Sequence, residues 1–446
     1  MSFYDDASLM LLASGGAQKD GKVYSVKPTD GAGDFTFTRG SNLSATRVDA
    51  SQLIEKGREN VLIYSNDFNS TWGLANVSVT SGQIGYDGLN DAWLLEKSSN
   101  DGRVYQNKSQ SGVQTFSVYA KKATSDYIRI FIDGISANVF FNLIDGSLYS
   151  ANNTAATSYS VDIGNGWWRI VVIVEGSGVR YRIYPAEAGS TSATSGSIYI
   201  QDAQLEQGLV ATPYIETGAT TAQAGILENT PRFDYSGGAT CPSLLLEPSR
   251  TNLFTQSEYF GGSSWTKVGS TTITNNYTTS PSGQNNATRL QWTNATNYIY
   301  QPVSHIGSNH TLSIYLKSNT GVSQNVRLFM DNGAKGKEVV VTTQWQRFEF
   351  TILQNTQSDR NAGLIKSSSQ VGDLDISIFA AQFEQNASYP TSYIPTYGVS
   401  QTRAVDDLKK IGIGDLIGDT QGTLFLDLEK TNNDTASLAG FFRVHL

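Results

Sequence analysis

The sequence contains little cysteine, histidine or charge, and each shortage limits what the protein can do. One cysteine, Cys241, stands among 446 residues, so no disulfide can form within the chain. His305 and His310 lie in a polar stretch without a cysteine or acidic partner at metal-ligand spacing, and we expect both to be solvated loop residues. The 32 basic and 40 acidic side chains give a net charge of −8 without a basic stripe, which argues against nucleic acid as a partner.

Long apolar runs and cofactor motifs are also missing. No segment approaches the roughly 20 apolar residues that a membrane span needs. Asp5 and Asp6 stand where a signal peptide carries basic residues, and the apolar run 9–13 that follows is too short for one. We therefore expect neither membrane insertion nor secretion through a signal peptide. No phosphate-binding loop, dinucleotide-binding fingerprint or nucleophile elbow is present, so we expect no cofactor.

What the sequence does contain is typical of a β-protein with many turns. Glycine is abundant, with 42 residues, and aromatic side chains make up 11% of the chain. Apolar and polar side chains alternate along 116–121, 128–133 and 312–317, which is the period of a strand. Helical periodicity is almost absent, and its best candidates are 51–56 and 405–410. The sequence therefore predicts an all-β fold.

An internal repeat sets the expected architecture. The run Asn60–Phe68 returns as Asn252–Phe260, and Ala203–Gln207 returns as Ala381–Gln385. Further matched blocks are Tyr105-Gln106 with Tyr300-Gln301, 116–121 with 312–317, 128–133 with 326–331, 166–169 with 344–347, and Tyr214-Ile215 with Tyr393-Ile394. Two units of about 150 residues, each with many alternating strands and polar turns, predict tandem antiparallel jelly-roll sandwiches.

One insertion distinguishes the two copies. The offset between matched residues is 198 at Asp133 and Asp331 but 178 at Trp167 and Trp345, so the first copy holds 20 extra residues in between. An Asp145-Gly146 pair inside this stretch predicts an added hairpin. We divide the chain into a head segment (1–57), a first jelly roll (58–217), a linker (218–248), a second jelly roll (249–403) and the start of a further domain (404–446).

Several runs resemble proteins of bacteriophage particles. Tyr24–Gly31 and Phe35–Arg39 in the head, with Glu228–Tyr235 and Leu244–Leu253 in the linker, resemble segments of phage fibre and tail proteins. The block Ala381–Gln385, followed by Tyr389–Pro395, is similar to the closing strand of family 4/9-type carbohydrate-binding jelly rolls. Residues 404–428 resemble the start of a concanavalin-like or laminin-G-like sandwich.

The resemblance implies a structural component of a phage virion, a tail or head fibre or receptor-binding protein, that displays glycan-binding-like modules for host attachment. Such a protein assembles in the host cytoplasm, is released by lysis and contacts other virion proteins through residues 1–57. We expect a homotrimer, because weak glycan contacts gain strength when several sites engage together. We expect no enzymatic activity. The alternatives are a polysaccharide depolymerase tailspike and a bacterial surface glycan-binding adhesin.

The acidic residues indicate structural roles. Glycan cleavage needs two carboxylates roughly 5–10 Å apart across a groove. The acids that recur, Glu206 with Glu384 and Asp133 with Asp331, lie at strand ends or turns in both copies, which favours hydrogen bonding or turn formation. Asp202 is a candidate ligand for a structural calcium in the first copy. The second copy has Ala380 at that position, which argues against a shared site.

Aromatic residues are the candidates for sugar stacking. Trp72 with Trp265 and Trp167 with Trp345 recur in both copies, which favours core packing. Trp168 follows Trp167 on one strand, so it points to the opposite face, where the second copy has Gln346. We therefore expect Trp168 to face solvent or another protomer, and Trp167 and Trp345 to be buried. The candidate glycan-binding residues are Trp168, Tyr181, Tyr184, Trp93 and Trp292.

Overall fold

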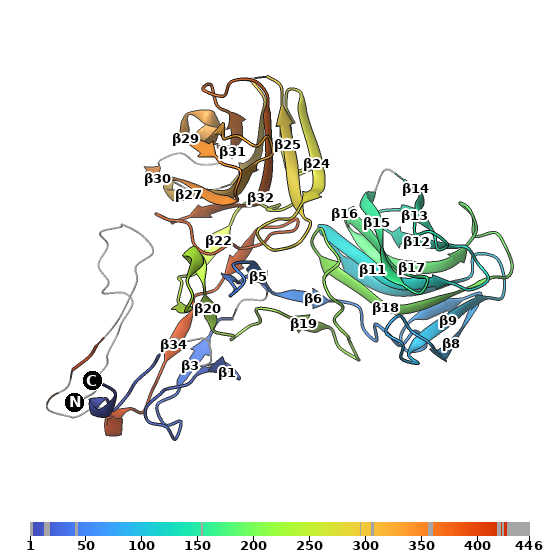
Figure 1. The fold of residues 1–446 in the computed structure, drawn as a ribbon, viewed down its shortest axis with the longest axis horizontal. Coiled ribbons are helices and arrows are strands. Elements are labelled where there is room, and N and C mark those ends of the chain that lie inside the picture. The colour runs from blue at the N-terminus through green and yellow to red at the C-terminus, as the bar shows by residue number, and fades with distance from the viewer. Residues whose placement is uncertain are drawn as a thin grey trace.

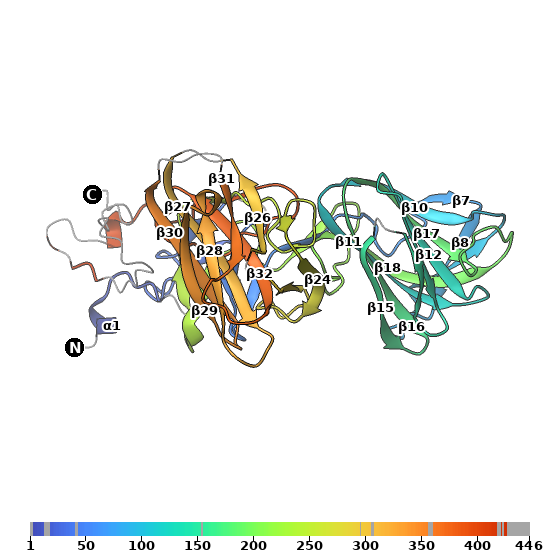
Figure 2. The ribbon, with the colours of Figure 1, turned by 90° about the horizontal axis from the view of Figure 1, so that it is seen from above.

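The computed structural model describes residues 3–12, 18–40, 43–152, 155–294, 296–304, 307–355, 360–416, 421 and 423–425. Within them the chain is almost entirely β-structure, with a single short α-helix, α1 (Phe3–Asp6), and the prediction of an all-β fold is confirmed. Figures 1 and 2 show two β-sandwiches side by side along the long axis of the molecule, with shorter strands beside the second one. No helix of the described residues is long and apolar enough to cross a membrane.

The first sandwich is made of two six-stranded antiparallel sheets. One sheet has the order β14-β13-β12-β17-β10-β7. Its strands are β7 (Gly73–Ala75), β10 (Arg103–Gln110), β12 (Tyr127–Asp133), β13 (Ala137–Asn142), β14 (Leu148–Ala151) and β17 (Gly178–Ala186). The other sheet has the order β15-β16-β11-β18-β9-β8. Its strands are β8 (Val77–Gln83), β9 (Ala92–Lys97), β11 (Val113–Lys122), β15 (Ala155–Gly164), β16 (Trp167–Glu175) and β18 (Ser197–Gln207).

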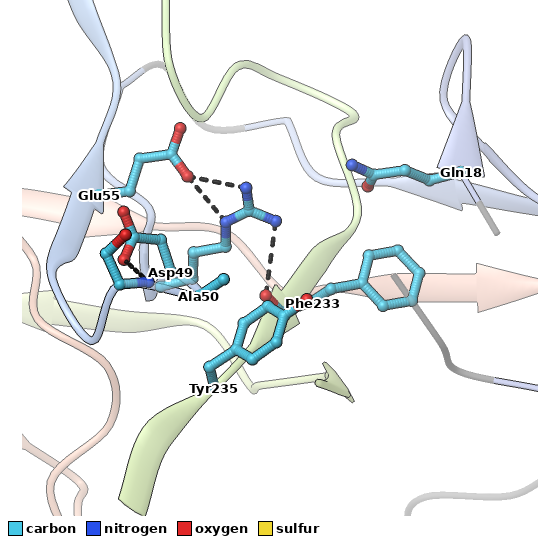
Figure 3. A pocket seen from close by; sticks show the side chains of 8 residues that line it. Gln18, Asp49, Ala50, Glu55, Phe233 and Tyr235 are labelled. Carbon is cyan, nitrogen blue, oxygen red and sulfur yellow. Dashed lines mark hydrogen bonds and ion pairs between the residues drawn. The ribbon is translucent and has the colours of Figure 1, made fainter. Parts of the chain in front are cut away.

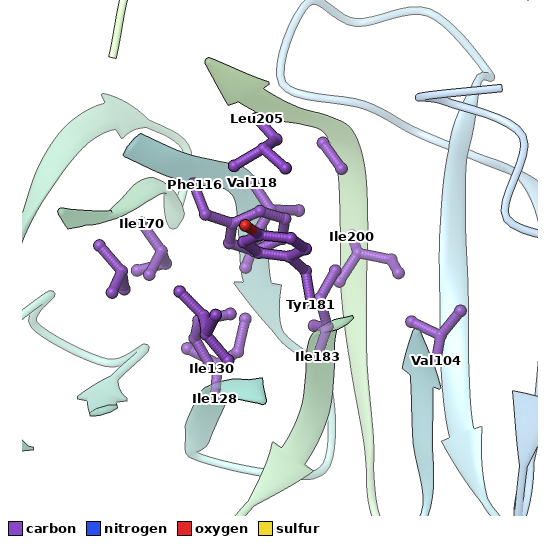
Figure 4. Packing of buried hydrophobic residues seen from close by; sticks show 14 of the residues in the cluster. Val104, Phe116, Val118, Ile128, Ile130, Ile170, Tyr181, Ile183, Ile200 and Leu205 are labelled. Atoms are coloured by element: carbon purple, nitrogen blue, oxygen red, sulfur yellow. The ribbon is translucent and has the colours of Figure 1, made fainter. Parts of the chain in front are cut away.

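Apolar side chains fill the space between these two sheets, because every second residue of each strand points inward. Ile128 and Ile130 of β12 meet Phe116 and Val118 of β11 there (Figure 4), and Ile132 belongs to the same core. Each of these five side chains has at most 1% of its surface exposed. Burying one such side chain stabilises the fold by about 1.5–3 kcal/mol relative to leaving it in water. The alternation read from the sequence therefore identifies these strands and the face that forms the core.

The second sandwich repeats this plan with a five-stranded and a seven-stranded sheet. Its five-stranded sheet has the order β23-β26-β31-β28-β29, with β23 (Thr266–Val268), β26 (Tyr298–Val303), β28 (Gln324–Met330), β29 (Lys335–Val341) and β31 (Arg360–Lys366). The opposing sheet contains β22 (Arg250–Asn252), β24 (Thr271–Thr278), β25 (Ala287–Trp292), β27 (Ser308–Ser318), β30 (Gln346–Asn355), β32 (Leu374–Gln385) and β33 (Gln401–Arg403).

The 20 extra residues of the first copy add one strand to each of its sheets. β13 and β14 form the antiparallel hairpin expected around Asp145 and Gly146, and β14 ends one sheet. β15 pairs with β16 and ends the other sheet. The insertion therefore extends both edges of the first sandwich on the same side.

The polar residues that recur in both copies tie each sandwich together. The side chain of Asn60 donates to the carbonyl oxygens of Ala203 and Ile215 at 3.2 and 2.9 Å and accepts from two backbone N–H groups. Asn252 makes the corresponding four bonds in the second copy. Because both asparagines are fully buried, leaving these partners without hydrogen bonds would be costly. The repeated asparagine therefore has the same structural role in both copies.

Beside the second sandwich, the head segment, the linker and residues 404–409 fold together into a unit that we call the base. β3 (Phe35–Thr38) pairs with β2 (Lys22–Val23) on one side and with β34 (Asp407–Lys409) on the other (Figure 1). Other base strands are β1 (Gln18–Lys19), β4 (Thr46–Val48), β5 (Ile54–Lys56), β6 (Arg58–Asn60), β19 (Ala222–Ala224), β20 (Arg232–Asp234) and β21 (Ser243–Leu245). The pairs are β1 with β2, β4 with β5, β6 with β19, and β20 with β21.

A buried ionic network holds the base together. Asp406 lies between the guanidinium groups of Arg39 and Arg232, and none of the three side chains is exposed. Glu247 pairs with Arg232 at 2.8 Å and with Arg403 at 3.0 Å. Burial works to raise the pKa of Glu247, but Arg403 and Arg232 outweigh it and hold this pKa at about 2. Charged side chains from the head, the linker, the end of the second repeat and the residues that follow it therefore pair with one another inside the base.

The two sandwiches also contact each other directly. Tyr259 of the second repeat packs on Val171 and Ile173, which lie on the outer face of β16. The backbone N–H of Val113 donates to the carbonyl oxygen of Tyr397 at 2.9 Å, and the carboxylate of Glu175 accepts from the Ser263 N–H at 3.1 Å. The outer face of the β16 sheet is therefore partly covered by the second repeat.

Two sequence expectations about local structure are wrong. Residues 51–56 and 405–410 are not helical, because they contribute β5 and β34. The one cysteine, Cys241, is exposed. Of residues 422–428, the end of the run that resembles the start of a concanavalin-like or laminin-G-like sandwich, the structure describes only 423–425, which have no regular secondary structure.

Candidate functional site

Two of the aromatic candidates cannot reach a ligand, because they lie in the cores. Tyr181 has no exposed surface and stacks on Phe116 with ring centroids 5.6 Å apart (Figure 4). Trp292 is fully buried in the core of the second sandwich. Tyr181 and Tyr184 are three residues apart on β17, so they point to opposite faces of the sheet and cannot form one platform. The predictions for Tyr181 and Trp292 are therefore wrong.

Trp167 and Trp168 do point to opposite faces, but the faces are the reverse of those expected. Trp168 packs against the core between the sheets, half-buried, and its Nε1 donates to the carbonyl oxygen of Leu143 at 3.1 Å. Trp167 lies on the outer face, where Tyr86 and Ile163 cover it and leave 1% exposed. Trp345, expected to be buried, is only partly covered. The prediction of a solvent-facing Trp168 platform is wrong, because the added hairpin of its own sandwich lies over the indole.

The other candidates also serve mainly in packing. Trp93 is half-buried against the first core, and its Nε1 donates to the carbonyl oxygen of Asn66 at 2.8 Å. Tyr184 points to the outer face, but only 2% of it is exposed. Trp72 and Trp265 are buried in the two cores, as the repeat indicated. His310, expected in a solvated loop, is buried and stacks on Phe383, whereas His305 lies outside the described residues.

Asp202 occupies a strained and poorly solvated position. Its backbone has a φ of +52°, in the left-handed region, at a bulge of β18, and Ala380 has a φ of +54° at the matching bulge of β32. Tyr86 donates a hydrogen bond to its carboxylate at 2.8 Å. Burial raises the pKa of Asp202 to about 7, and the nearby carboxylates of Asp91 and Asp87 add to the rise. Among the described residues no group of three or more His, Cys, Asp or Glu side chains could hold a metal ion, so calcium at Asp202 gains no support.

The recurring glutamates act as hydrogen-bond acceptors inside the sandwiches. Glu206 accepts from the backbone N–H and the hydroxyl of Thr212, at 2.9 and 2.6 Å. Glu384 accepts from the same two groups of Thr391, at 3.0 and 2.5 Å. Both glutamates are almost fully buried, so neither can reach a substrate. These hydrogen bonds agree with the structural role that the sequence indicates for Glu206 and Glu384.

A pocket in the base offers little chemistry (Figure 3). It is lined by Gln18, Arg47, Asp49, Ala50, Ser51, Glu55, Phe233 and Tyr235. Its one guanidinium group, on Arg47, is already paired with Glu55 at 2.8 Å and donates to the carbonyl oxygen of Phe233 at 3.4 Å. The charge of Arg47 is therefore neutralised by Glu55, and the carboxylate of Asp49 accepts hydrogen bonds from the backbone N–H groups of Ser51 and Leu53.

The outer face of the β12–β17–β10 sheet is different, because arginines and aromatic rings alternate across it. We call it the arginine face. Its residues are Arg103, Tyr105 and Asn107 of β10, Arg180, Arg182 and Tyr184 of β17, Arg129, Phe131 and Asp133 of β12, and Asn138 and Phe140 of β13. They alternate along each strand with the core residues described above, so all of them point away from the core.

Strand pairing places each central arginine between two rings. Arg182 lies opposite Tyr105 on one side and Phe131 on the other. Arg129 lies opposite Tyr184 and Phe140, with its guanidinium carbon 4.7 Å from the centroid of the Tyr184 ring. The guanidinium carbon of Arg180 is 5.0 Å from the centroid of Tyr105. These are cation–π distances, so the guanidinium groups cover rings that would otherwise be open to solvent.

The charges on the arginine face are mostly of one sign. Four arginines stand beside one carboxylate, that of Asp133, which pairs with Arg182 and lies 3.8 Å from Arg180. No ion pair to Arg103 or Arg129 is found among the described residues. Burial lowers the pKa of Arg129, Tyr184 and the nearby carboxylate of Asp101 oppose this effect, and Arg182 and Arg103 add to it. Hydrogen bonds to Asn138 at 2.7 Å and to Asn107 at 2.6 Å fix the Nε groups of Arg129 and Arg180.

The matching face of the second sandwich keeps two of the rings and one of the arginines, since Ile365 and Glu338 stand where the first copy has Tyr184 and Phe140. Tyr300 and Phe329 correspond to Tyr105 and Phe131, but Gly363 lies between them where the first copy has Arg182. Tyr298 and Tyr300 stack with centroids 5.8 Å apart and are half-buried. Its one matching arginine, Arg327, lies 3.8 Å from Glu338. The two copies thus present different chemistry on equivalent faces.

Sequence reasoning missed the arginine face, although a signal was present. Arg180, Arg182 and Tyr184 occupy alternate positions of one strand, and Arg129 and Phe131 do so on another. This alternation predicts that all five side chains share a face with one another, since residues i, i+2 and i+4 of a strand point the same way.

Comparison with known proteins gives limited information. No protein-family model and no curated protein matches the chain. Similar solved structures include the tandem CBM22 domains of Paenibacillus barcinonensis Xyn10C, with 13% identity over 77% of this chain and 98% of that one, at a TM-score of 0.23. The tandem CBM51 modules of Streptococcus pneumoniae Sp3GH98 show 13% identity over 79% and 100%, at 0.18. The tailspike protein 4 domain of bacteriophage CBA120 shows 19% identity over 30% and 21%, at 0.23. TM-scores this low carry no argument about function.

Proposed function

We propose that this protein is a non-enzymatic structural component of a bacteriophage virion, a tail or head fibre or receptor-binding protein, that attaches the particle to glycan on the host surface. The observation that carries the proposal is the arginine face. Glycan sites in proteins combine planar apolar groups with a few fixed polar groups. The alternating rings and hydrogen-bonded guanidinium groups of this face supply both.

The arrangement of the molecule supports display of this face. The outer face of the opposite sheet of the first sandwich is partly covered by Tyr259 of the second repeat. The arginine face belongs to the other sheet, and the hydrogen bonds and ring contacts given above join its side chains to one another. We propose that the base, which contains the head segment, contacts other virion proteins while the first sandwich meets the host.

A binding role fits the carboxylates better than a cleaving role. Among the described residues of the arginine face, Asp133 is the one acid, and it is paired with Arg182. Hydrolysis of a glycosidic bond ordinarily needs a second carboxylate across the substrate. Incubation with host polysaccharide should therefore leave the concentration of reducing ends unchanged, and a rise with time would identify a depolymerase.

We also propose that the protein acts as a homotrimer, because several weak glycan sites on one particle bind more tightly together than one does alone. Light scattering of the purified protein should give three times the chain mass of 48.4 kDa. A mass of one chain, both in solution and in the particle, would contradict this part of the proposal.

Two experiments test the main proposal. Mass spectrometry of purified particles of the encoding phage should detect the chain, and absence from the particle would exclude a virion role. The purified protein should bind intact host cells and compete with the phage for adsorption. If it neither binds cells nor slows adsorption, attachment is not its function.

A further inference from the structure

We infer that the arginine face of the first sandwich binds anionic glycans, through carboxylate or other acidic substituents of the sugar. This inference rests on the proposed function and names the class of glycan. The protein as a whole carries a net charge of −8, yet this face gathers four arginines beside Asp133, and Asp101 is the one other carboxylate that acts on Arg129. Its local charge is therefore opposite to that of the chain.

The covered rings argue for recognition of anions over plain stacking. A neutral sugar stacks its C–H face on an open aromatic ring. On the arginine face, Tyr184 and Phe140 have 2% and 4% of their surfaces exposed. Arg129 lies over both rings, 4.7 and 5.6 Å from their centroids. At these two rings the groups that remain for a ligand are consequently guanidinium N–H donors, whereas Tyr105 and Phe131 are only half-buried.

The guanidinium groups are also held in place before a ligand arrives. The Nε of Arg129 is bound to Asn138 and its plane is packed among three rings, so little side-chain entropy remains to be lost on binding. The planar fork of arginine matches a carboxylate or phosphate with two parallel hydrogen bonds. A row of fixed guanidinium groups thus suits a polymer that carries an acid on successive sugars.

The second sandwich provides a comparison within the same chain. At the position of Arg182 it has Gly363, and at the position of Arg180 it has Asn361, as the strand register shows. Its half-buried rings, Tyr298 and Tyr300, are not covered by a guanidinium group in any contact of the described residues. The excess of arginine is therefore specific to the first copy.

The test measures binding to pairs of polymers that differ in charge alone. Polygalacturonate is compared with its methyl ester, and dextran sulfate with dextran, using the full-length protein. We expect the acidic member of at least one pair to bind ten-fold or more tightly than its neutral counterpart, with affinity falling as salt rises. The first pair reports on carboxylates and the second on sulfate esters, so the stronger response identifies the acidic group.

Variants assign the binding to the arginine face. Arg129→Gln and Arg180→Gln should each weaken binding to the preferred acidic polymer about ten-fold, the size of one charge-assisted hydrogen bond. Arg289→Gln is the matched control, because Arg289 also pairs with an acid, Asp375, and lies 4.8 Å from the Tyr277 centroid, but on the second sandwich. It should bind as the wild type does. Thermal unfolding of each variant confirms that the fold is intact, and Arg180, at 39% side-chain exposure, is the safer substitution.

Two results overturn the inference. If neither acidic polymer binds better than its neutral counterpart, the face does not select anions. If the arginine variants bind acidic polymer as Arg289→Gln does, another surface is responsible. In both cases binding to host cells can persist, and the proposed function then stands. If the wild-type protein does not bind host cells at all, this result counts against the proposed function itself.

Discussion

At the scale of single residues, burial decides the chemistry of this protein more than residue type does. Tyr181 and Tyr184 are both tyrosines of β17, but one stacks in the core and the other lies under arginines on the outer face. Asp202 and Asp133 are both acids of the first repeat, but Asp133 pairs with Arg182 whereas Asp202 meets a tyrosine and other carboxylates. The environment of each group therefore sets its role.

Asp202 predicts a pH dependence of stability. Its pKa is raised to about 7 in the folded protein, mainly by burial, whereas an unfolded aspartate titrates near 4. The folded state therefore holds a proton between about pH 4 and 7 that the unfolded state has lost. The contribution of this proton to the free energy of unfolding is fully present below the pKa of the unfolded state and is lost as the pH rises through the pKa of the folded state. Urea unfolding should show the first sandwich more stable at pH 5 than at pH 7.5, by about 2 kcal/mol.

The variant Asp202→Asn should remove most of that difference, because a neutral amide does not titrate. Asp373→Asn, a change of the same kind at an exposed site of the second sandwich, should leave it in place. An unaltered pH dependence in Asp202→Asn would show that Asp202 is ionised in the folded protein at pH 5 and that its burial is less costly than proposed.

At the scale of elements, the repeat and the alternation of side chains predict the strands well, but not what covers them. The period of two places Trp167 and Trp168 on opposite faces, as found, yet it does not say which face is inward. That depends on the added hairpin and on Tyr86, which cover Trp168 and Trp167 from other parts of the chain. The strands of the base are only two to four residues long, too short to show any periodicity.

The contact between the added hairpin and Trp168 can be tested with a pair of glycines. Gly146 has a φ of +73°, and a Cβ atom there would lie 2.3 Å from the Trp168 ring. Gly166 has a φ of +78°, but the nearest atom to its Cβ position is 3.6 Å away on the flexible Lys121 side chain. Gly166→Ala should cost about 1 kcal/mol for its backbone alone. Gly146→Ala should cost about 1–3 kcal/mol more, because the ring must move.

Chemical denaturation followed by tryptophan fluorescence measures both variants. The Gly146→Ala protein should also show a changed fluorescence maximum, since Trp168 loses its cover. Equal costs for the two substitutions would mean that the hairpin does not pack on Trp168 in solution.

At the scale of the whole molecule, the base joins parts of the chain that are far apart in sequence. The ion pair of Arg39 and Asp406 spans 367 residues, and β3 pairs with β34 across a similar separation. No local pattern predicts such pairings, which is why the sequence suggests a separate head segment, linker and tail. The resemblance of short runs to segments of known proteins identifies those runs, but it does not show with which other segments of the chain they pair.

The ionic network predicts how the base responds to loss of one charge. Asp406→Asn leaves Arg39 and Arg232 buried without their shared carboxylate, which should cost about 3–5 kcal/mol. Asp407→Asn, at the next position, removes an exposed ion pair with Lys409 and should cost less than about 1 kcal/mol. Hydrogen exchange should speed up in β3 and β34 of the first variant while the strands of the two sandwiches remain protected.

Protection of β3 and β34 in Asp406→Asn equal to that in Asp407→Asn would contradict a structural role for the network. Faster exchange throughout both sandwiches would show instead that the base and the sandwiches unfold as one unit. The first result bears on the network alone, and the second bears on how the base is coupled to the rest of the protein.

The most direct test of the account is an experimental structure of the protein with an oligosaccharide of the acidic polymer that it binds best. We predict density for the sugar over β12, β17 and β10, with an acidic oxygen within hydrogen-bond distance of Arg129 or Arg180. Density on any other surface, with the arginine face empty at saturating ligand, would contradict the assignment of this face as the glycan site.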